Sequence, residues 1–306
     1  MTIESEPYRD WRSVEMAIKS AAAIAHLLDP TRLVDDLIRQ TYYDRFLCRV
    51  FCDGDKSEWV LKGGGSMLAR VPNARRTLDA DIYREGFDKD QALADLRRIA
   101  AVDLGDFFRF VYREHHPILT QDFQPYADGY RVVFDAYLGP RSLQPIKVDL
   151  TAHVIPITIV APTVPANRLE LPKLPSFAYR LYPITNQIAD KVCASLTILA
   201  GKPSSREKDL VDLVVIALTH TIDANQTREA IQNEARIRRL ALPERFRLPT
   251  TWGRAYAKLA RNTPAAGHNI ADAQALMTTF IDPLLDGTAT GMVWIPGGLA
   301  WVASRT

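Results

Sequence analysis

The stretch RRTLDADIY, residues 75 to 83, holds two aspartates, Asp79 and Asp81, that are one residue apart. In a β-strand the side chains alternate between faces, so both carboxylates point to the same side. Their apolar neighbours Leu78, Ala80 and Ile82 then point to the other side. Two like charges this close repel each other, and a bound cation would relieve that repulsion. The stretch therefore predicts a strand with a cation-binding pair of carboxylates, although a solvated strand end is the simpler interpretation.

A glycine-rich turn precedes this strand, in LKGGGSML, residues 61 to 68. Glycines let a backbone turn sharply, and the free amides at a helix N-terminus bind phosphate. The turn is not a Walker A loop, because no Lys-Ser/Thr follows the glycines. By itself it could be an ordinary strand-to-helix turn. About a dozen residues separate Ser66 from Asp79, and a phosphate-binding turn followed by two carboxylates favours a site for Mg²⁺ and a nucleotide.

A third carboxylate from a neighbouring strand would complete such a site. Asp149 lies in PIKVDLTAHV, residues 145 to 154, between Val148 and Leu150. A charged residue within an apolar strand needs a partner or a metal ion. Asp135, in the equally apolar VVFDAYLG, is a competing candidate. The sequence leaves both residues open at this point.

The composition is that of a globular protein with a full core. The chain has 306 residues, of which 47% are hydrophobic and 24% are charged. Between Gln226 and Asn262 there are eight Arg and one Lys against three Glu, so this segment carries +6 although the whole chain carries only +2. The excess predicts an anionic partner such as RNA for the arginines in EARIRRLALPERFRLP, although a solvated helix face is the alternative. The residues concerned are Arg236, Arg238 and Arg239.

The cellular location is predicted from three features of the sequence. Cys48, Cys52 and Cys193 are too few for a disulfide framework and lack the spacing of a zinc site. The first residues, MTIESEPYRDW, are polar, and no apolar run reaches the length of a membrane span. These features predict a reduced, cytoplasmic protein without a membrane partner.

The pattern of apolar residues predicts N-terminal helices, a mixed sheet and a helical C-terminal part. Domain boundaries are expected at 1–55 for N-terminal helices that pack on the core, 56–165 for the sheet domain and 180–306 for the helical domain. Helices are expected at 11–27, 31–51, 88–101, 186–200, 205–220, 226–241, 250–262 and 269–285. Strands are expected in SEWVL, LDADIY, FFRFVYR, GYRVVFDAYLG and PIKVDLTAHV. The tail MVWIPGGLAWVA is either a short strand or an apolar flap.

Lys191 and Asp212 are charged residues on apolar helices. Lys191 borders the stripe formed by Ile188, Val192, Leu196 and Leu199, where it could extend to solvent as an ordinary surface lysine. Asp212 lies within LVDLVVIAL and is not expected to be unpaired there. It could pair with Lys208 one turn earlier, or it could position Lys191 or a substrate group. Asp209 begins the same helix and could serve only as a local cap.

The full set of motifs resembles the AbiEii-type branch of the DNA polymerase β-like nucleotidyltransferases. The matching strings are LKGGGSML, RRTLDADI, IKVDL, IADKVCAS and REKDLVDL, and the resemblance runs from about Thr41 to Ala217. The branch contains nucleotidyltransferase toxins of bacterial, including mycobacterial, toxin–antitoxin systems. The family pattern falls on Arg75, Thr77, Asp79, Asp81, Lys191, Lys208, Asp209 and Asp212. One departure is Gly65-Ser66, where the family more often has Thr-Ala.

The resemblance implies a two-lobed α/β enzyme with a polymerase β-like mixed sheet and a mainly helical C-terminal domain. It implies Mg²⁺ on Asp79, Asp81 and Asp149, an NTP bound by Lys62, Gly64, Gly65, Ser66 and Lys191, and a catalytic role for Lys191 and Asp212. The nucleotide, CTP or UTP in preference, would be added to the 3′ end of tRNA, with weak RNA contacts from Arg75 and Arg76. A cognate antitoxin is also implied, and a kinase-like antitoxin would phosphorylate Thr77. The hydroxyl of Thr77 could instead bond only to the local backbone.

Two other functions remain open from the sequence. The same chemistry could act on a protein hydroxyl or on a small molecule such as an aminoglycoside. A non-catalytic protein that binds RNA or a partner through a degenerate site is the third possibility, and the intact set of carboxylates argues against it.

Overall fold

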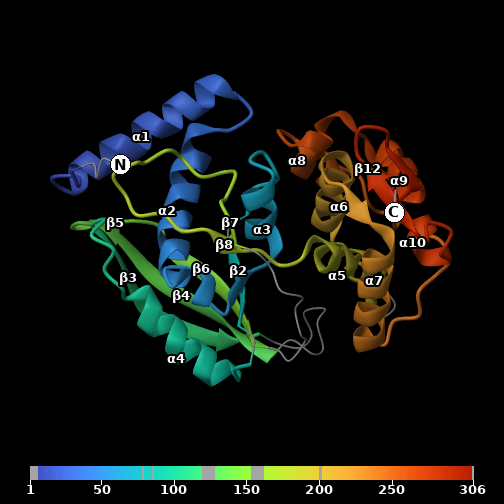
Figure 1. Ribbon diagram of the computed structural model, residues 1–306, viewed down its shortest axis with the longest axis horizontal. Helices are drawn as coiled ribbons and strands as arrows, with labels where there is room; N and C mark the ends of the chain where they lie inside the picture. The colour runs from blue at the N-terminus through green and yellow to red at the C-terminus, as the bar shows by residue number, and fades with distance from the viewer. Residues whose placement is uncertain are drawn as a thin grey trace. The chain divides into compact units, whose positions relative to one another are not determined.

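A computed structural model describes residues 6–77, 79–84, 86–118, 128–152, 162–199 and 202–304 (Figure 1). Contacts within the chain divide these residues into two compact units. The first unit holds residues 6–72 and 76–182, and the second holds residues 73–75 and 183–304, with the gaps given above. The short segment Asn73–Arg75 thus belongs to the second unit. Arg75 is the first residue of RRTLDADIY, and the rest of that stretch belongs to the first unit.

The first unit is built on a mixed sheet with the strand order β1-β2-β6-β4-β3, and β5 pairs with β4. Strands β2 and β6 are parallel, and the other neighbours are antiparallel. A separate two-stranded ladder joins β7 and β8. The strands are β1 (Trp59–Leu61), β2 (Ala80–Arg84), β3 (Phe108–Pro117), β4 (Asp128–Leu138), β5 (Arg141–Ser142), β6 (Ile146–Ala152), β7 (Pro162–Thr163) and β8 (Tyr179–Arg180).

Four α-helices accompany this sheet, and in Figure 1 the blue α2 lies over the strands. The ring of Phe46 on α2 packs against the rings of Phe110 and Phe134 on the strands. Asp88 and Gln91 form a capping box at the start of α4, which fixes where that helix begins. The helices are α1 (Trp11–Leu28), α2 (Val34–Val50), α3 (Gly63–Arg70) and α4 (Lys89–Ala100), with a 3₁₀ turn η1 (Gly54–Lys56).

One face of the sheet packs into the main core. The opposite face, here called the polar face, carries Asp81 and Asp149 and also a small buried cluster of Val60, Tyr83 and Tyr182. In β6 the buried residues Ile146, Val148 and Leu150 alternate with more exposed ones, and they belong to the same core cluster as residues of α2 and α4. Asp149 alternates with these residues and therefore points to the opposite face. The alternation therefore places Asp149 and its register partner Asp81 on the face opposite the core.

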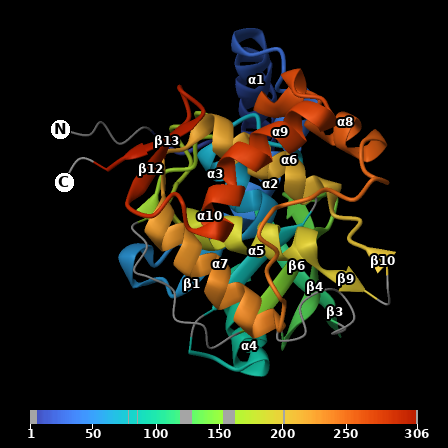
Figure 2. The ribbon, with the colours of Figure 1, turned by 90° about the vertical axis from the view of Figure 1, so that its right-hand side faces the viewer.

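The second unit is mainly helical (Figure 2). Helix α6 is buried almost all round, from Asp209 to Ala217. Strands β12 and β13 form a hairpin that pairs with β11, and Trp294 and Trp301 pack there against Phe280. The elements are α5 (Ile184–Leu196), β9 (Ile198–Leu199), β10 (Lys202–Pro203), α6 (Glu207–Thr219), β11 (Ile222–Asp223), α7 (Ala224–Arg238), α8 (Arg254–Ala260), η2 (Pro264–Gly267), α9 (Ile270–Phe280), α10 (Asp282–Asp286), β12 (Met292–Ile295) and β13 (Ala300–Ala303).

The predicted fold class, a mixed α/β sheet with helices and a mainly helical C-terminal part, is confirmed. Several boundaries differ from the prediction. The helix expected at 186–200 ends at Leu196, and Ile198–Leu199 form β9 instead. The helix expected at 250–262 covers only Arg254–Ala260, and the one expected at 31–51 begins at Val34. The helix expected at 269–285 is divided into α9 and α10, with Pro283 in the first turn of the second helix. Strand β2 begins at Ala80, so Asp79 lies in the bend before it. The three-part domain division stays a prediction, and the first unit contains both the N-terminal helices and the sheet.

Within the described ranges, no helix has the length and apolar character needed to cross a membrane.

Candidate active site

The glycine turn lies against the first carboxylate strand. Lys62 precedes α3, and Gly63 begins the helix with φ +58°, a conformation that favours glycine. A Cβ atom on Gly63 would lie 1.8 Å from Oδ2 of Asp81, and one on Gly64 would lie 2.8 Å from Cβ of Thr77. The two glycines therefore let Asp81 and Thr77 approach the first turn of α3. Gly63 was not among the site residues expected from the sequence.

A methyl group at Gly63 is expected to disturb this approach. The change Gly63→Ala should cost about 1–3 kcal/mol of stability through the positive φ, and it should also push the Asp81 carboxylate away. The change Gly86→Ala is the matched control, because Gly86 has φ +76° and a Cβ there would meet nothing within 4 Å. Urea unfolding and nucleotide-transfer rates of both variants are the measurements. If Gly63→Ala transfers nucleotide no more slowly than Gly86→Ala, the close approach has no functional importance.

Asp81 and Asp149 are direct neighbours on adjacent parallel strands, because Asp81 of β2 is the register partner of Asp149 of β6. Side chains of such partners lie on the same face, and neighbouring strands are about 4.8 Å apart. Asp135 of β4 is instead the register partner of Val111 on β3 and forms an ion pair with Arg113. Of the two candidates for the third carboxylate, Asp149 is the one that lies beside Asp81.

The carboxylates of the sheet meet part of the coordination that Mg²⁺ needs. In the described part of the chain, no group of three or more His, Cys, Asp or Glu side chains is arranged to hold a metal ion by itself. Mg²⁺ is usually held by one or two carboxylates and takes its other oxygens from substrate phosphates and water. Asp81 and Asp149 provide hard oxygen donors on one face, and the glycine at position 63 leaves room for one of them. The donor set therefore fits a Mg²⁺ ion only if substrate phosphates and water would supply its other oxygens.

The ammonium of Lys62 lies against an aromatic ring, whereas the hydroxyl of Ser66 is buried and hydrogen-bonded to Arg70. The Lys62 ammonium lies 4.4 Å from the ring centroid of Tyr182, a cation–π distance, beside the start of α3. Ser66 is fully buried, and its hydroxyl accepts a hydrogen bond from Arg70, which also donates to the carbonyl of Tyr182 at 2.6 Å. Burial lowers the pKa of Arg70 to about 10. A direct contact of the Ser66 hydroxyl with a phosphate would thus require Arg70 to move.

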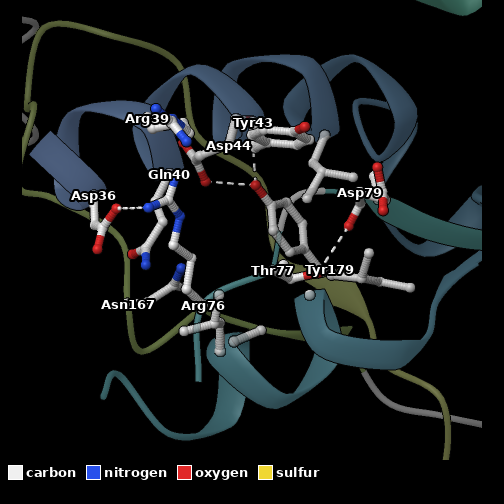
Figure 3. A pocket seen from close by; sticks show the side chains of 16 residues that line it. Asp36, Arg39, Gln40, Tyr43, Asp44, Arg76, Thr77, Asp79, Asn167 and Tyr179 are labelled. Atoms are coloured by element: carbon white, nitrogen blue, oxygen red, sulfur yellow. Dashed lines mark hydrogen bonds and ion pairs between the residues drawn. The ribbon is translucent and has the colours of Figure 1, made fainter. Parts of the chain in front are cut away.

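A cavity of about 40 Å³ lies beside Asp79 and Thr77 in the first unit (Figure 3). Figure 3 shows Tyr43 from α2 near Asp79, and the Thr77 hydroxyl donates to the backbone carbonyl of Asp79 at 3.2 Å. Burial, with a smaller contribution from the Asp79 charge, raises the pKa of Tyr43 to about 12, although a backbone hydrogen bond with Lys147 opposes the shift. The local backbone contact expected for Thr77 is therefore present. Neither Asp81 nor Asp149 lines this cavity.

Lys191 is buried in the second unit, where two aspartates bind its ammonium. Its Nζ lies 2.5 Å from Oδ2 of Asp212 and 3.2 Å from Oδ1 of Asp209. The alternative of an ordinary surface lysine is wrong, because only 5% of Lys191 is exposed. Asp209 is also more than a local cap, since it is buried and binds both Lys191 and Arg206. The sequence signal for Asp209 was a charged residue on a helix that is apolar nearly all round.

Arg75 completes this cluster through Asp212. Its Nη2 donates to Oδ2 of Asp212 at 2.9 Å, and its Nε donates to the carbonyl of Lys208 at 3.3 Å. The partner of Asp212 is therefore Lys191 together with Arg75. The other carboxylate oxygen of Asp212, Oδ1, is buried and has no hydrogen-bond donor among the described residues.

The charges in the cluster support one another. Burial alone would lower the pKa of Lys191, but the charges of Asp212 and Asp209 outweigh it and raise that pKa above its ordinary value. Burial would raise the pKa of Asp209, but the charges of Lys191 and Arg206 outweigh it and hold that pKa below its usual range. The buried ammonium is therefore charged at neutral pH. Its direct contact with a triphosphate stays a prediction.

The arginines proposed to contact RNA have different surroundings. Arg236 and Arg239 are exposed near the end of α7, and Arg76 is half-exposed and pairs with Asp36 at 3.0 Å. The side chain of Arg238 is only 3% exposed and pairs with Glu234 at 2.5 Å, so its expected contact with RNA is not supported. Helical periodicity turns this side chain inward, although Arg236 and Arg239 are exposed. Arg75 is likewise engaged with Asp212 and is not a surface cation of the kind expected.

A glycine turn at a helix start, beside a pair of aspartates on a mixed sheet, is typical of nucleotidyltransferases. Residues 45–291 match the profile of the family described as nucleotidyl transferase AbiEii toxin, type IV TA system. Because this match covers most of the chain, the chain belongs to the AbiEii family of nucleotidyltransferase toxins. Membership in a type IV toxin–antitoxin family implies an antitoxin partner. No curated protein sequence matches the chain.

Two solved structures are similar to this chain at low identity. The nucleotidyltransferase toxin MenT4 from Mycobacterium tuberculosis H37Rv is 16% identical, with a TM-score of 0.47 over 85% of this chain and 93% of MenT4. JHP933 from Helicobacter pylori is 14% identical, with a TM-score of 0.41 over 83% of this chain and 93% of JHP933. Both identities are too low for substrates or site residues to be transferred from these proteins.

Proposed function

We propose that this toxin transfers a nucleoside monophosphate from an NTP to the 3′ end of tRNA and thereby blocks aminoacylation and translation. CTP and UTP are the favoured substrates, and Mg²⁺ is the proposed cofactor. The observation that carries the proposal is the pair Asp81 and Asp149 on adjacent parallel strands, with Asp81 against the glycine turn. Family membership supports the nucleotidyltransferase chemistry. The nucleotide, the RNA acceptor and the cytoplasmic location are inferences from the sequence resemblance.

The residues of the site have distinct proposed tasks. Asp79, Asp81 and Asp149 would hold Mg²⁺, which when bound neutralises charge on the phosphates and activates the attacking hydroxyl. The amides of Gly64 and Gly65 at the start of α3 would bind the β- and γ-phosphates, with the ammonium of Lys62 nearby. Together these residues would hold the α-phosphorus so that the acceptor hydroxyl can attack it opposite the bridging oxygen. A new bond to that phosphorus then forms as its bond to the bridging oxygen breaks, and pyrophosphate leaves.

Lys191 and Asp212 are the proposed contribution of the second unit. Lys191 would neutralise charge on the triphosphate, and Asp212 would hold the lysine in position. The ion pair between them, together with Arg75, supports the positioning role of Asp212. Because Asp209 binds the same ammonium, the positioning role extends to both aspartates.

We also propose that phosphorylation of Thr77 regulates nucleotide transfer, as the sequence resemblance implies. A kinase-like antitoxin would phosphorylate its hydroxyl, and the phosphate would add about −1.5 to −2 charges near Asp79. Thr77 lies against Gly64 at the start of α3, so an added phosphate group would crowd the turn proposed to bind the nucleotide.

The direct test is transfer of label from each of the four α-labelled NTPs to total RNA, to protein or to small molecules. We expect label at the 3′ end of tRNA with CTP or UTP, and none with an Asp79→Ala protein. Label on a protein or a small molecule would instead select the alternative acceptor. If no NTP is consumed with any acceptor, the chain is a non-catalytic binding protein.

A further inference from the structure

Arg131 stands next to the proposed metal ligands in a row across the sheet. It lies on β4, and its register partner on β6 is Asp149, which is in turn the register partner of Asp81 on β2. Register partners on neighbouring strands project to the same face. The row on the polar face therefore runs from Asp81 through Asp149 to Arg131, a carboxylate pair followed by a cation.

The guanidinium of Arg131 takes both oxygens of the Asp149 carboxylate. Its Nε donates to Oδ1 at 2.9 Å, and its Nη2 approaches Oδ2 at 3.4 Å. This fork geometry is the one in which arginine binds a carboxylate most specifically. In this structure the positive charge of Arg131 thus offsets part of the repulsion between Asp149 and Asp81.

The pair has the features of an exchangeable contact. The side chain of Arg131 is 54% exposed, and that of Asp149 is 23% exposed. Ion pairs exposed to this degree add little to stability, because water competes for both partners. Arg131 is also not one of the buried residues that form the core. Stability of the fold alone therefore gives no strong reason for an arginine at this position.

We propose that Arg131 is a positioning residue that occupies Asp149 while no divalent cation is bound and releases it when the cation binds. The inference rests on the proposed function, because it takes Asp149 as a metal ligand. Mg²⁺ and the guanidinium would compete for the same oxygens of Asp149. Two positive charges bound to one carboxylate also repel each other. Before the metal arrives, Arg131 keeps the carboxylate oriented on the polar face and offsets the repulsion from Asp81. The consequence is that the carboxylates are already oriented for the metal ion, but the affinity of the site for that ion is lower than it would be without Arg131.

The test is the affinity of the nucleotide-free protein for Mn²⁺, measured by electron paramagnetic resonance of the free ion. Removal of the competing cation in Arg131→Gln is expected to tighten Mn²⁺ binding about three- to tenfold. Arg131→Lys keeps the charge but loses the fork, so its affinity should fall between those of the wild type and Arg131→Gln. Arg113→Gln is the matched control, because Arg113 forms a comparable ion pair with Asp135 on the same sheet. Its Mn²⁺ affinity should equal that of the wild type.

An Asp81→Asn protein separates this inference from the proposed function. If Mn²⁺ binds Asp81→Asn as tightly as it binds the wild type, the metal site itself is wrong. If Asp81→Asn weakens binding while Arg131→Gln leaves it unchanged or weaker, the site stands and the proposed competition by Arg131 is overturned. Thermal unfolding of each variant verifies that all of them are folded.

Discussion

Asp81→Asn is expected to lower the rate of nucleotide transfer by about 10³-fold or more, the size of a lost charge contact in phosphoryl transfer. Asparagine has almost the same shape, so it can still pack beside Gly63. What it lacks is the negative charge that would hold Mg²⁺ between this strand and Asp149 on the neighbouring strand. The loss should therefore appear in kcat at saturating NTP, with little change in the free energy of unfolding.

Asp135→Asn is the matched control for this substitution. Asp135 also lies on an apolar strand of the same sheet, but its partners are Val111 and Arg113. Its transfer rate should stay within about twofold of wild type, because an exposed ion pair contributes little. Label transfer from α-labelled CTP or UTP to tRNA measures both variants. Equal rates for Asp81→Asn and wild type, or a large loss in Asp135→Asn alone, would contradict the assignment of the carboxylates.

Asp106→Ala is expected to destabilise the first unit by about 3–5 kcal/mol, because it leaves two arginines with uncompensated buried charge. Asp106 is fully buried and binds Arg49 at 2.7 Å and Arg45 at 2.7 Å. Its Oδ1 also accepts the backbone N–H of Phe108 at 3.1 Å, which ties the start of β3 to helix α2. Urea unfolding followed by circular dichroism measures the loss.

Glu58→Ala is the control for the buried cluster. Glu58 pairs with Arg84 at 3.0 Å, but its side chain is 58% exposed. Its removal should cost at most about 1 kcal/mol. If the two substitutions change the free energy of unfolding equally, burial does not determine the importance of these ion pairs.

The Asp106 carboxylate also determines how the stability of the fold changes with pH. Burial would raise the pKa of Asp106, but the hydrogen bonds and charges of Arg49 and Arg45 outweigh it and lower that pKa below its ordinary value. A carboxyl with a depressed folded-state pKa stabilises the fold above its unfolded pKa, about 3.9, and loses that contribution as pH falls through the folded value. The wild type should thus lose stability below about pH 4 more steeply than Asp106→Ala, as acid titration at fixed urea would measure.

Much of the fold could be predicted from the sequence because it depends on local patterns. The alternation of apolar and charged residues in IKVDL predicted a strand, and the glycines before Ser66 predicted a turn into a helix. The structure has β6 and α3 at these positions. The boundary at Asp79 could not be predicted, because strand β2 begins where its backbone pairing with β6 begins, at Ala80 opposite Val148.

The choice between Asp149 and Asp135 shows what residue patterns alone left undecided. Both residues lie in apolar strands, so the alternation of residues does not distinguish the two, and only the resemblance of IKVDL to the AbiEii pattern favoured Asp149. The parallel pairing of β2 with β6 brings Asp149 beside Asp81, whereas Asp135 faces β3. Sheet order results from which apolar faces bury together, and this depends on residues far apart in the chain. The same reason explains why Arg131 was not expected, since only the register of β4 on β6 brings it to Asp149.

The sequence by itself determined the parts of this protein that neighbouring residues control. These are the glycine turn, the two aspartates one residue apart, the strand and helix periods, and the charge carried by Lys191 and Asp212. Tertiary structure alone decided how Asp149 comes to lie beside Asp81, that Lys191 is buried between Asp209 and Asp212, and that Arg131 pairs with Asp149. Backbone dihedral preferences and the spacing of apolar residues depend on a few neighbouring residues, so they can be recognised directly in the sequence. Strand register and charge pairing follow from burial of the whole core, which no short stretch specifies.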